Sequence, residues 1–179
     1  MEKIIGLGNA LVDVLARVDN DDILQAMALP KGSMTLINDD MFLKINEYLL
    51  QQNTKLSNGG SAGNAIRALA HLDSCTGFIG KIGNDLYGQF FRKELKKLSI
   101  EDKLLVSAER PSGVASTFIS EGGERTFATF LGAAATLLPE ELTPEMFKDY
   151  TYLFIEGYLV QDHDLILQAI ELAKREGLQ

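Results

Sequence analysis

The sequence contains a single cysteine, Cys75, and no tryptophan. One thiol excludes the disulfide framework that staples many small secreted domains. Because Cys75 begins the apolar run CTGFIGKI, we expect a buried small hydrophobic residue rather than a reactive thiol. No signal peptide precedes the first strand-like segment, and no apolar run approaches the roughly 18 residues of a membrane span. These absences predict a cytoplasmic protein.

Positive charge is also scarce, since 17 Lys and Arg residues face 25 Asp and Glu residues, for a net charge of −8. An acidic chain repels phosphodiester backbones, which disfavours a nucleic-acid partner. Only two histidines are present, His71 and His163, and neither has a Cys or His partner at metal-ligand spacing. We therefore expect both histidines to be structural and predict no metal site in this chain.

The phosphate-binding loops of common nucleotide-binding folds are missing. The Gly-Lys pair in CTGFIGKI lacks the first glycine and the following Ser or Thr of a P-loop. The G-x-G of GLGNAL lacks the third glycine of a dinucleotide-binding fingerprint. Neither motif supports phosphate binding here.

Strand-like and helix-like segments alternate along the chain, which predicts an α/β fold with a mostly parallel sheet. A second set of half-exposed strands is expected around residues 11–18, 33–37 and 113–129. The last of these, GVASTFISEGGERTFATF, alternates in period two around Gly122–Gly123 and predicts a β-hairpin with Phe118 opposite Phe127. The final helix should lead to another parallel strand, so we expect a portion of a longer α/β domain.

Asn9 and Asp13 follow the first predicted strand, at the edge where open α/β sheets bind ligands. On an uninterrupted extended segment they would share one face, where a carboxylate and an amide suit a ligand with several hydroxyls. The alternative places Asn9 in a turn and Asp13 on a solvent-facing strand. Their spacing alone leaves both interpretations open.

The stretch NGGSAGN combines a glycine turn with the start of a long helix. Gly59 and Gly60 would let a ligand approach the main chain, Ser61 is a natural N-cap, and Asn64 would lie at position N3. Free N–H groups at a helix start favour oxygen-rich ligands. An ordinary Ser-capped helix is the alternative, although three glycines exceed what a cap requires.

Two charged residues remain undecided at this level. Arg125 follows the hairpin turn, where it is either an anion clamp or simply solvated. Glu156 interrupts an apolar strand in FIEGY, where an unpaired buried carboxylate would be costly. It is either a strand-end residue facing a cleft or a paired core residue.

Five segments together resemble the N-terminal part of the ribokinase-like, PfkB-type carbohydrate and nucleoside kinases. They occur in the family's order and cover nearly the whole chain: GLGNALVDVLA, NGGSAGNAIRALAHL, GFIGKIGNDLYGQFF, GVASTFISEGGERTF with LGAAATLL, and YLFIEGYLV. The GN-x-x-x-D opening and GGSAGN are more similar to the adenosine-kinase branch. Ribokinases typically carry Lys at the position of Ser61, a departure that disfavours ribose as the acceptor.

The resemblance implies a Rossmann-like sheet flanked by helices, incomplete at the C-terminus, with a small β-sheet lid. It implies that Asn9, Asp13, Gly60 and Asn64 hold acceptor hydroxyls and that Arg125 stabilises the transferred phosphoryl group. Apolar and aromatic candidates for contacts with a nucleobase are Met34, Phe127, Phe130 and Tyr158.

The resemblance also implies ATP and Mg²⁺ for the full-length enzyme, with neither held tightly by residues 1–179. The family's catalytic Asp lies in a C-terminal GAGD motif, which this sequence lacks. We therefore expect the acceptor-binding half of a kinase acting on a nucleoside or a sugar, inactive by itself. A sugar kinase of the ribokinase or fructokinase type and a non-catalytic binding module stay as alternatives. A homodimer through the lid strands is also compatible with the resemblance, because lids in this family often pair between subunits.

Overall fold

The computed structural model describes residues 2–179 and contains nine strands, six α-helices and three short 3₁₀ helices in that range. The strands are β1 (Lys3–Leu7), β2 (Leu11–Arg17), β3 (Met34–Leu36), β4 (Thr54–Asn58), β5 (Cys75–Gly83), β6 (Glu101–Ser107), β7 (Gly113–Ile119), β8 (Arg125–Phe130) and β9 (Tyr152–Ile155). The helices are α1 (Asp22–Ala26), α2 (Asp39–Leu50), α3 (Ser61–His71), α4 (Leu86–Lys97), η1 (Gly132–Thr136), η2 (Pro139–Glu141), α5 (Pro144–Phe147), η3 (Gly157–Gln161) and α6 (His163–Arg175).

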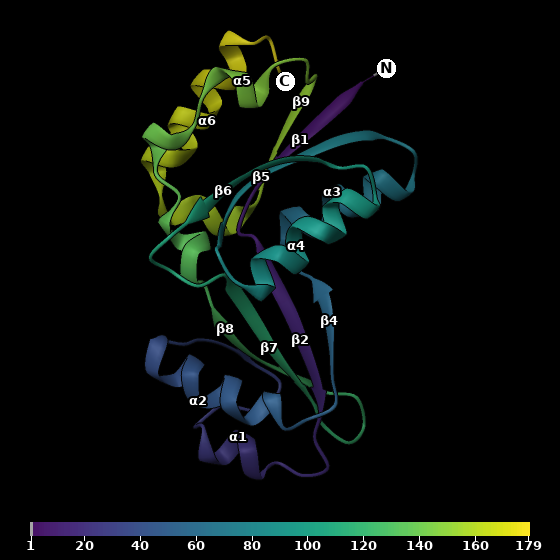
Figure 1. The fold of residues 1–179 in the computed structure, drawn as a ribbon, viewed down its shortest axis with the longest axis vertical. Helices are drawn as coiled ribbons and strands as arrows, with labels where there is room; N and C mark the ends of the chain where they lie inside the picture. The colour runs from purple at the N-terminus through teal and green to yellow at the C-terminus, as the bar shows by residue number, and fades with distance from the viewer. Residues whose placement is uncertain (1) are drawn as a thin grey trace.

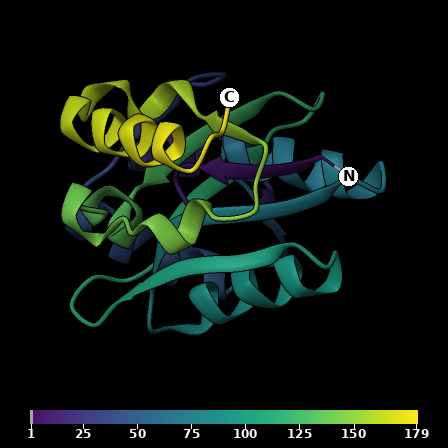
Figure 2. The same ribbon diagram turned by 90° about the horizontal axis from the view of Figure 1, so that it is seen from above.

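The first sheet is parallel throughout, with strand order β6-β5-β1-β9. On one side, Ile66 of α3 and Phe91 of α4 pack with Phe78 of β5. On the other side, Ile5 of β1 packs in a cluster that includes Leu165 of α6. Figure 2 shows the resulting layers, with α6 on one side of the sheet and α4 on the other. The predicted mostly parallel sheet flanked by helices is confirmed.

The second sheet is mixed, with strand order β3-β8-β7-β2-β4. The β2–β7 and β3–β8 pairs are parallel, whereas the β2–β4 and β7–β8 pairs are antiparallel. This sheet and the helices α1 and α2 form one end of the molecule, and both chain termini lie at the other end (Figure 1). The strands β2, β3, β7 and β8 occupy the ranges expected for the lid, and β4 joins them in the same sheet.

One face of the second sheet is covered by α1 and α2. Phe42 of α2 stacks on Phe130 of β8 with ring centroids 4.3 Å apart, and Tyr48 contacts Phe118 of β7. The alternate residues of β2, Val12 and Val14, are almost fully buried in the same cluster. Period-two alternation on these strands thus separates an apolar covered face from a second face with a different character.

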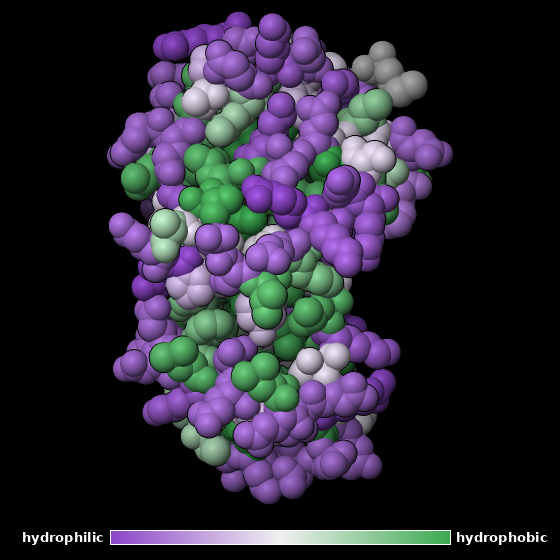
Figure 3. Space-filling view, in the orientation of Figure 1, coloured by the Kyte–Doolittle hydropathy of each residue, from purple (hydrophilic) through white to green (hydrophobic). Residues whose placement is uncertain are grey.

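We call this second face the open face, because its residues are outside both hydrophobic clusters. Strand register places the following residues on it: Asp13, Leu15, Arg17, Met34, Leu36, Lys55, Ser57, Ala115, Thr117, Ile119, Arg125, Phe127 and Thr129. The space-filling view shows hydrophobic residues gathered around the waist of the molecule and hydrophilic ones at its two ends (Figure 3).

The hairpin exists, but its predicted register was wrong by one residue. Phe118 pairs with Thr126, and Thr117 pairs with Phe127. The Ser120 amide donates to the Glu124 carbonyl, which leaves a three-residue loop instead of a two-residue one. Because a one-residue slip exchanges the two faces of a strand, Phe118 belongs to the covered face and Phe127 to the open face.

Three further features differ from the expectations. The predicted burial of Cys75 was wrong, since its position at the start of β5 leaves it exposed at the sheet margin. The strand β6 was missed, because its charged first residues obscure the apolar run that follows. The apolar strand β9 is not fully buried, since Phe154 near its end is 41% exposed.

As expected, the chain returns to the first sheet after α6. The Gln179 amide donates to the Thr151 carbonyl, and the Leu153 amide donates to the Gln179 carbonyl, each at 2.9 Å. This is the hydrogen-bond pattern of a parallel bridge beside β9.

Within residues 2–179, none of the helices is both long enough and apolar enough to cross a bilayer.

The observed hairpin register makes Phe118 and Phe127 energetically different. We expect Phe118→Ala to lower the free energy of unfolding by about 3–5 kcal/mol, because it empties a fully buried site. Phe127→Ala, on the half-buried open face, should cost less than half as much. Urea unfolding of both variants measures the difference, and equal losses would contradict the register.

Candidate functional site

The Glu156 carboxylate joins three separate parts of the chain. It follows β9 directly, and only 3% of the residue is exposed. Oε1 accepts hydrogen bonds from the Asn9 backbone amide at 2.8 Å and from the Asn9 side-chain amide. Oε2 accepts from the Ser61 hydroxyl and the Ala62 backbone amide, each at 3.0 Å. Glu156 is therefore both a strand-end residue and a buried, fully hydrogen-bonded one.

The start of α3 differs from the prediction. Gly60 is the N-cap, Ser61 is the first helical residue, and the Asn64 amide donates the first helical bond to the Gly60 carbonyl, so the expected Ser61 cap was wrong. Ser61 is not needed as a cap because the Glu156 carboxylate accepts from the Ala62 amide in its place. Asn64 consequently lies at N4 rather than N3, on the first turn of the helix.

The paired glycines are explained by close contacts within the protein. A Cβ at Gly59 would lie 2.2 Å from Oδ1 of Asp13, and a Cβ at Gly60 would lie 2.3 Å from the Asn9 carbonyl oxygen. Gly60 also has a φ of +77°, which disfavours residues with a side chain. The turn therefore brings α3 directly beneath the Asp13 carboxylate.

Asp13 is a half-buried carboxylate on the open face of β2. No donor among residues 2–179 forms a hydrogen bond with its side chain, in contrast to Glu156. Burial raises the pKa of Asp13 above its ordinary value, while the charges of Arg67 and Arg125 act in the opposite direction. A carboxylate that is partly desolvated without protein donors is suited to accept hydrogen bonds from a ligand.

Asn9 is not arranged beside Asp13 as the four-residue spacing suggested. The chain bends at Gly8, so Asn9 lies in the connection between β1 and β2 instead of on an uninterrupted strand. Its buried side chain is held by Glu156. Asn9 thus lies at the base of the site, and Asp13 lies on the sheet above Gly59.

The other predicted residues lie in three places. Arg125, Phe127 and Met34 lie on the open face with Asp13, and Arg125 is close enough to affect the Asp13 pKa. Tyr158 lies in η3 and is 69% exposed. It lines a hollow of about 430 Å³ with Ser61 and Glu156, and a second hollow of about 190 Å³ with Asn9. Phe130 lies on the covered face of β8, stacked on Phe42.

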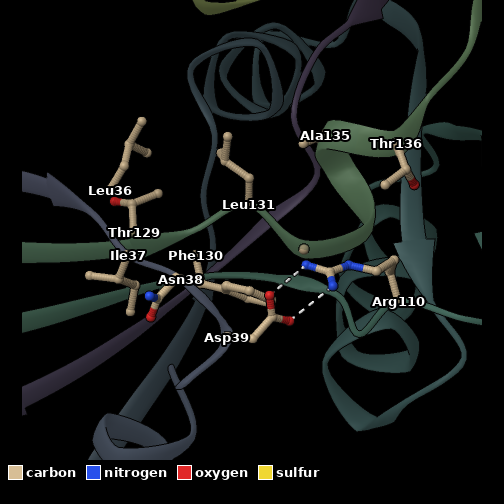
Figure 4. Close-up of a pocket in the computed structure, with 11 residues that line it drawn as sticks. Leu36, Ile37, Asn38, Asp39, Arg110, Thr129, Phe130, Leu131, Ala135 and Thr136 are labelled. Carbon is tan, nitrogen blue, oxygen red and sulfur yellow. Dashed lines mark hydrogen bonds and ion pairs between the residues drawn. The ribbon is translucent and has the colours of Figure 1, made fainter. Parts of the chain in front are cut away.

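A further hollow of about 510 Å³ lies between the ends of β3 and β8, the start of α2, Arg110 and η1 (Figure 4). Arg110 and Asp39 form a two-bond ion pair at its rim, with N–O distances of 3.0 and 3.1 Å. The Arg110 guanidinium also lies over the Phe130 ring. Both charged side chains are well exposed, so this pair contributes little to stability.

Residues 33–178 match the profile of the pfkB family carbohydrate kinases. This chain belongs to that family. The match covers the second sheet from β3 onward, α3 with its glycine turn, and the remainder of the first sheet up to α6. The expected resemblance is therefore confirmed.

Relatives from several organisms agree with this assignment. Guanosine-inosine kinase of Escherichia coli (strain K12) is 28% identical over 96% of this chain and 42% of its own length. Ribokinase of Staphylococcus aureus (strain COL) is 27% identical over 79% of this chain and 49% of its own length. The crystal structure of adenosine kinase from Sinorhizobium meliloti has a TM-score of 0.81 and 30% identity, covering 99% of this chain and 55% of that one. The chain thus spans about half the length of these proteins.

Two residues near the site carry contacts that the sequence patterns did not indicate. Glu156 is anomalous in the sequence, but its partners on the β1–β2 connection and α3 are 147 and 94–95 positions away. Arg67 of α3 contacts Asn58 and Asn64. Its position three residues after Asn64 is the signal that could have identified it, since such residues are neighbours on a helix.

Removing the Glu156 carboxylate should destabilise the junction. Glu156→Ala leaves the Asn9 and Ala62 amides without their acceptor, and we expect a loss of about 3 kcal/mol in the free energy of unfolding. Glu156→Gln should be intermediate because one acceptor oxygen remains. Glu140→Gln, at an exposed position, is the matched control and should change little. Urea unfolding measures all three, and a Glu156→Ala variant as stable as the control would refute this role.

Neutralising Asp13 should stabilise the fold at neutral pH. The pKa of Asp13 is raised in the folded state, so the folded protein holds this proton more tightly than the unfolded chain. Ionisation therefore costs stability as pH rises from the ordinary value of 3.8 through the folded pKa. We expect Asp13→Asn to raise Tm at pH 7, with a gain that shrinks towards pH 3. A lower Tm at pH 7 would contradict the desolvation argument.

Proposed function

We propose that this chain forms the acceptor-binding half of an ATP-dependent kinase that phosphorylates a hydroxyl group of a nucleoside. The observation that carries the proposal is the arrangement of polar and apolar residues on the open face. Asp13 and Ser57 are register partners nearest the glycine turn, and Leu15, Phe127 and Met34 belong to the next register row. Hydroxyl-binding groups and an apolar platform thus lie side by side.

This arrangement matches the two parts of a nucleoside. Asp13 accepts hydrogen bonds from sugar hydroxyls, and Asn64, exposed on the first turn of α3, adds an amide. Phe127 and Met34 offer an apolar surface to the base, since stacking on an aromatic ring tolerates any base. The names of relatives such as the guanosine-inosine and adenosine kinases support a nucleoside, while the ribokinase relative keeps a free sugar as the alternative.

We propose that Arg125 contacts the transferred phosphoryl group. It begins β8 on the open face, and its charge acts on Asp13, so it approaches the same ligand from the hairpin side. A guanidinium there would stabilise negative charge on a transferred phosphoryl group. We propose that the second sheet acts as the lid over the acceptor, with Arg125 beside the reacting oxygen.

The rest of the chemistry is proposed to come from residues outside this sequence. Within residues 2–179, no group of three or more His, Cys, Asp or Glu side chains is arranged to hold a metal ion. We propose that Mg²⁺ and ATP are held mainly by residues outside this sequence. We propose that the catalytic base is also supplied elsewhere, so that this chain binds the acceptor without phosphorylating it.

Isothermal titration of the chain with inosine, guanosine, adenosine and ribose tests the proposal. We expect at least one nucleoside to bind about tenfold more tightly than ribose. Asp13→Ala should weaken every ligand, because all contain the sugar hydroxyls. Phe127→Ala should weaken the nucleosides about tenfold and leave ribose unchanged.

Leu167→Ala, at an exposed position on α6, is the control and should bind as the wild type does. Ribose binding as tightly as the nucleosides would identify a free sugar as the acceptor. The absence of binding by all four compounds would refute the proposed function.

A further inference from the structure

Arg67 bridges the glycine turn and the first turn of α3. One guanidinium nitrogen, Nη1, donates to the Asn58 carbonyl at 2.6 Å and to Oδ1 of Asn64 at 3.4 Å. Asn58 is the last residue of β4 and immediately precedes Gly59. A single side chain therefore connects the end of β4, the turn beneath Asp13, and the amide expected to bind the acceptor.

Asn58 is itself immobilised from the other side. Only 1% of the residue is exposed, and its side-chain amide donates to the Phe91 carbonyl of α4 at 3.0 Å. Arg67 thus contacts a turn that is already anchored to the first sheet's helical layer. This gives Asn64 a fixed neighbour, so its orientation depends on a rigid part of the molecule.

The contact decides which end of the Asn64 amide is available. Because Oδ1 faces Arg67, the Nδ2 group is left to face outward as a donor. The Asp13 carboxylate, when ionised, has no proton to donate and acts only as a hydrogen-bond acceptor. One donor and one acceptor beside each other complement a pair of neighbouring hydroxyls, each of which both donates and accepts.

The arginine is also incompletely satisfied. Its Nε is buried and has no hydrogen-bond partner among the described residues, and the same holds for Oδ1 of Asn58. Buried polar groups are normally paired, so an unpaired one requires a reason. The hydrogen bond from Nη1 to the Asn58 carbonyl accounts for the arginine structurally, and its unpaired Nε is an additional cost.

We propose that Arg67 is a positioning residue of the acceptor site, which orients Asn64 so that its amide nitrogen reads a hydroxyl of the sugar. The inference rests on the proposed function, because it needs an acceptor at Asp13 and Asn64. Arg67 acts through Asn64 and through the turn and does not itself contact the acceptor.

The charge of Arg67 gives this residue a second effect on the same ligand. The charged groups that act on Asp13 are Arg67 from α3 and Arg125 from β8, and both lower the pKa of its carboxyl against the effect of burial. Loss of the Arg67 charge should therefore raise the pH at which Asp13 becomes ionised and able to bind hydroxyls.

A double-mutant cycle tests the proposal with inosine, 2′-deoxyinosine and 3′-deoxyinosine as the probes. Arg67→Met should weaken inosine binding roughly tenfold, as expected for a lost charge-assisted contact. Asn64→Ala should bind one of the two deoxy analogues as tightly as it binds inosine. Arg67→Met should reduce the preference for inosine over that same analogue. At a pH well above the midpoint of Asp13 ionisation, where the charge effect of Arg67 on Asp13 no longer matters, Arg67→Met should have almost no further effect in the Asn64→Ala background.

A control variant, a substitute variant and a pH titration accompany the cycle. Arg92→Met removes a comparable helix arginine, hydrogen-bonded to Asp102 at 2.6 Å, and should leave binding unchanged. Arg67→Gln, which also removes the charge, replaces Arg67→Met in the cycle if the latter does not fold. Arg67→Met should also shift the pH midpoint of inosine binding upward, whereas Arg67→Lys should retain the wild-type midpoint.

Additive effects of the Arg67 and Asn64 substitutions, or equal weakening of all three ligands, would overturn the inference while leaving the proposed function intact. Failure of the wild-type chain to bind any of the nucleosides or ribose would instead remove the proposed function, and with it this role of Arg67.

Discussion

The site depends on the hydrogen bonds that the buried Glu156 carboxylate accepts. It satisfies the Asn9 and Ala62 amides, which would otherwise be left without acceptors where β1 ends and α3 begins. A side chain from the far end of the sequence thereby caps a helix that has only glycine at its own N-cap. Because a buried carboxylate is tolerated only when fully hydrogen-bonded, its four donors constrain the positions of three chain segments at once.

The Asp13 carboxylate has the opposite role from that of Glu156. Asp13 lies a few residues after Asn9 in the chain. No protein donor among the described residues compensates its partial burial, and its pKa is raised as a result. Glu156 organises the scaffold, whereas Asp13 stays available for a ligand and lowers the stability of the fold. That contrast distinguishes a structural acid from one kept for a ligand, and it locates the candidate site on the open face above the glycine turn.

Local sequence patterns are sufficient to predict much of this arrangement. The alternation of strands and helices predicted the parallel sheet, and the apolar alternation of β2 and β7 predicted a two-faced second sheet. The unusual stretch NGGSAGN correctly marked the turn beneath Asp13. Its glycines, however, serve close contacts with Asp13 and Asn9 of the protein itself, a requirement that only the folded chain reveals. The features that were missed have different physical causes. The hairpin has a three-residue loop, closed by the hydrogen bond from Ser120 to Glu124, whereas the exposure of Cys75 depends on where β5 begins at the sheet margin.

The sequence by itself determined the fold class, the family and the residue types at the site, because periodicity and glycine placement act over short distances. Tertiary structure alone decided that Glu156 replaces Ser61 as the cap and that Arg67 lies against Asn64. Hydrogen bonds between segments far apart in the chain depend on distances that no local pattern specifies.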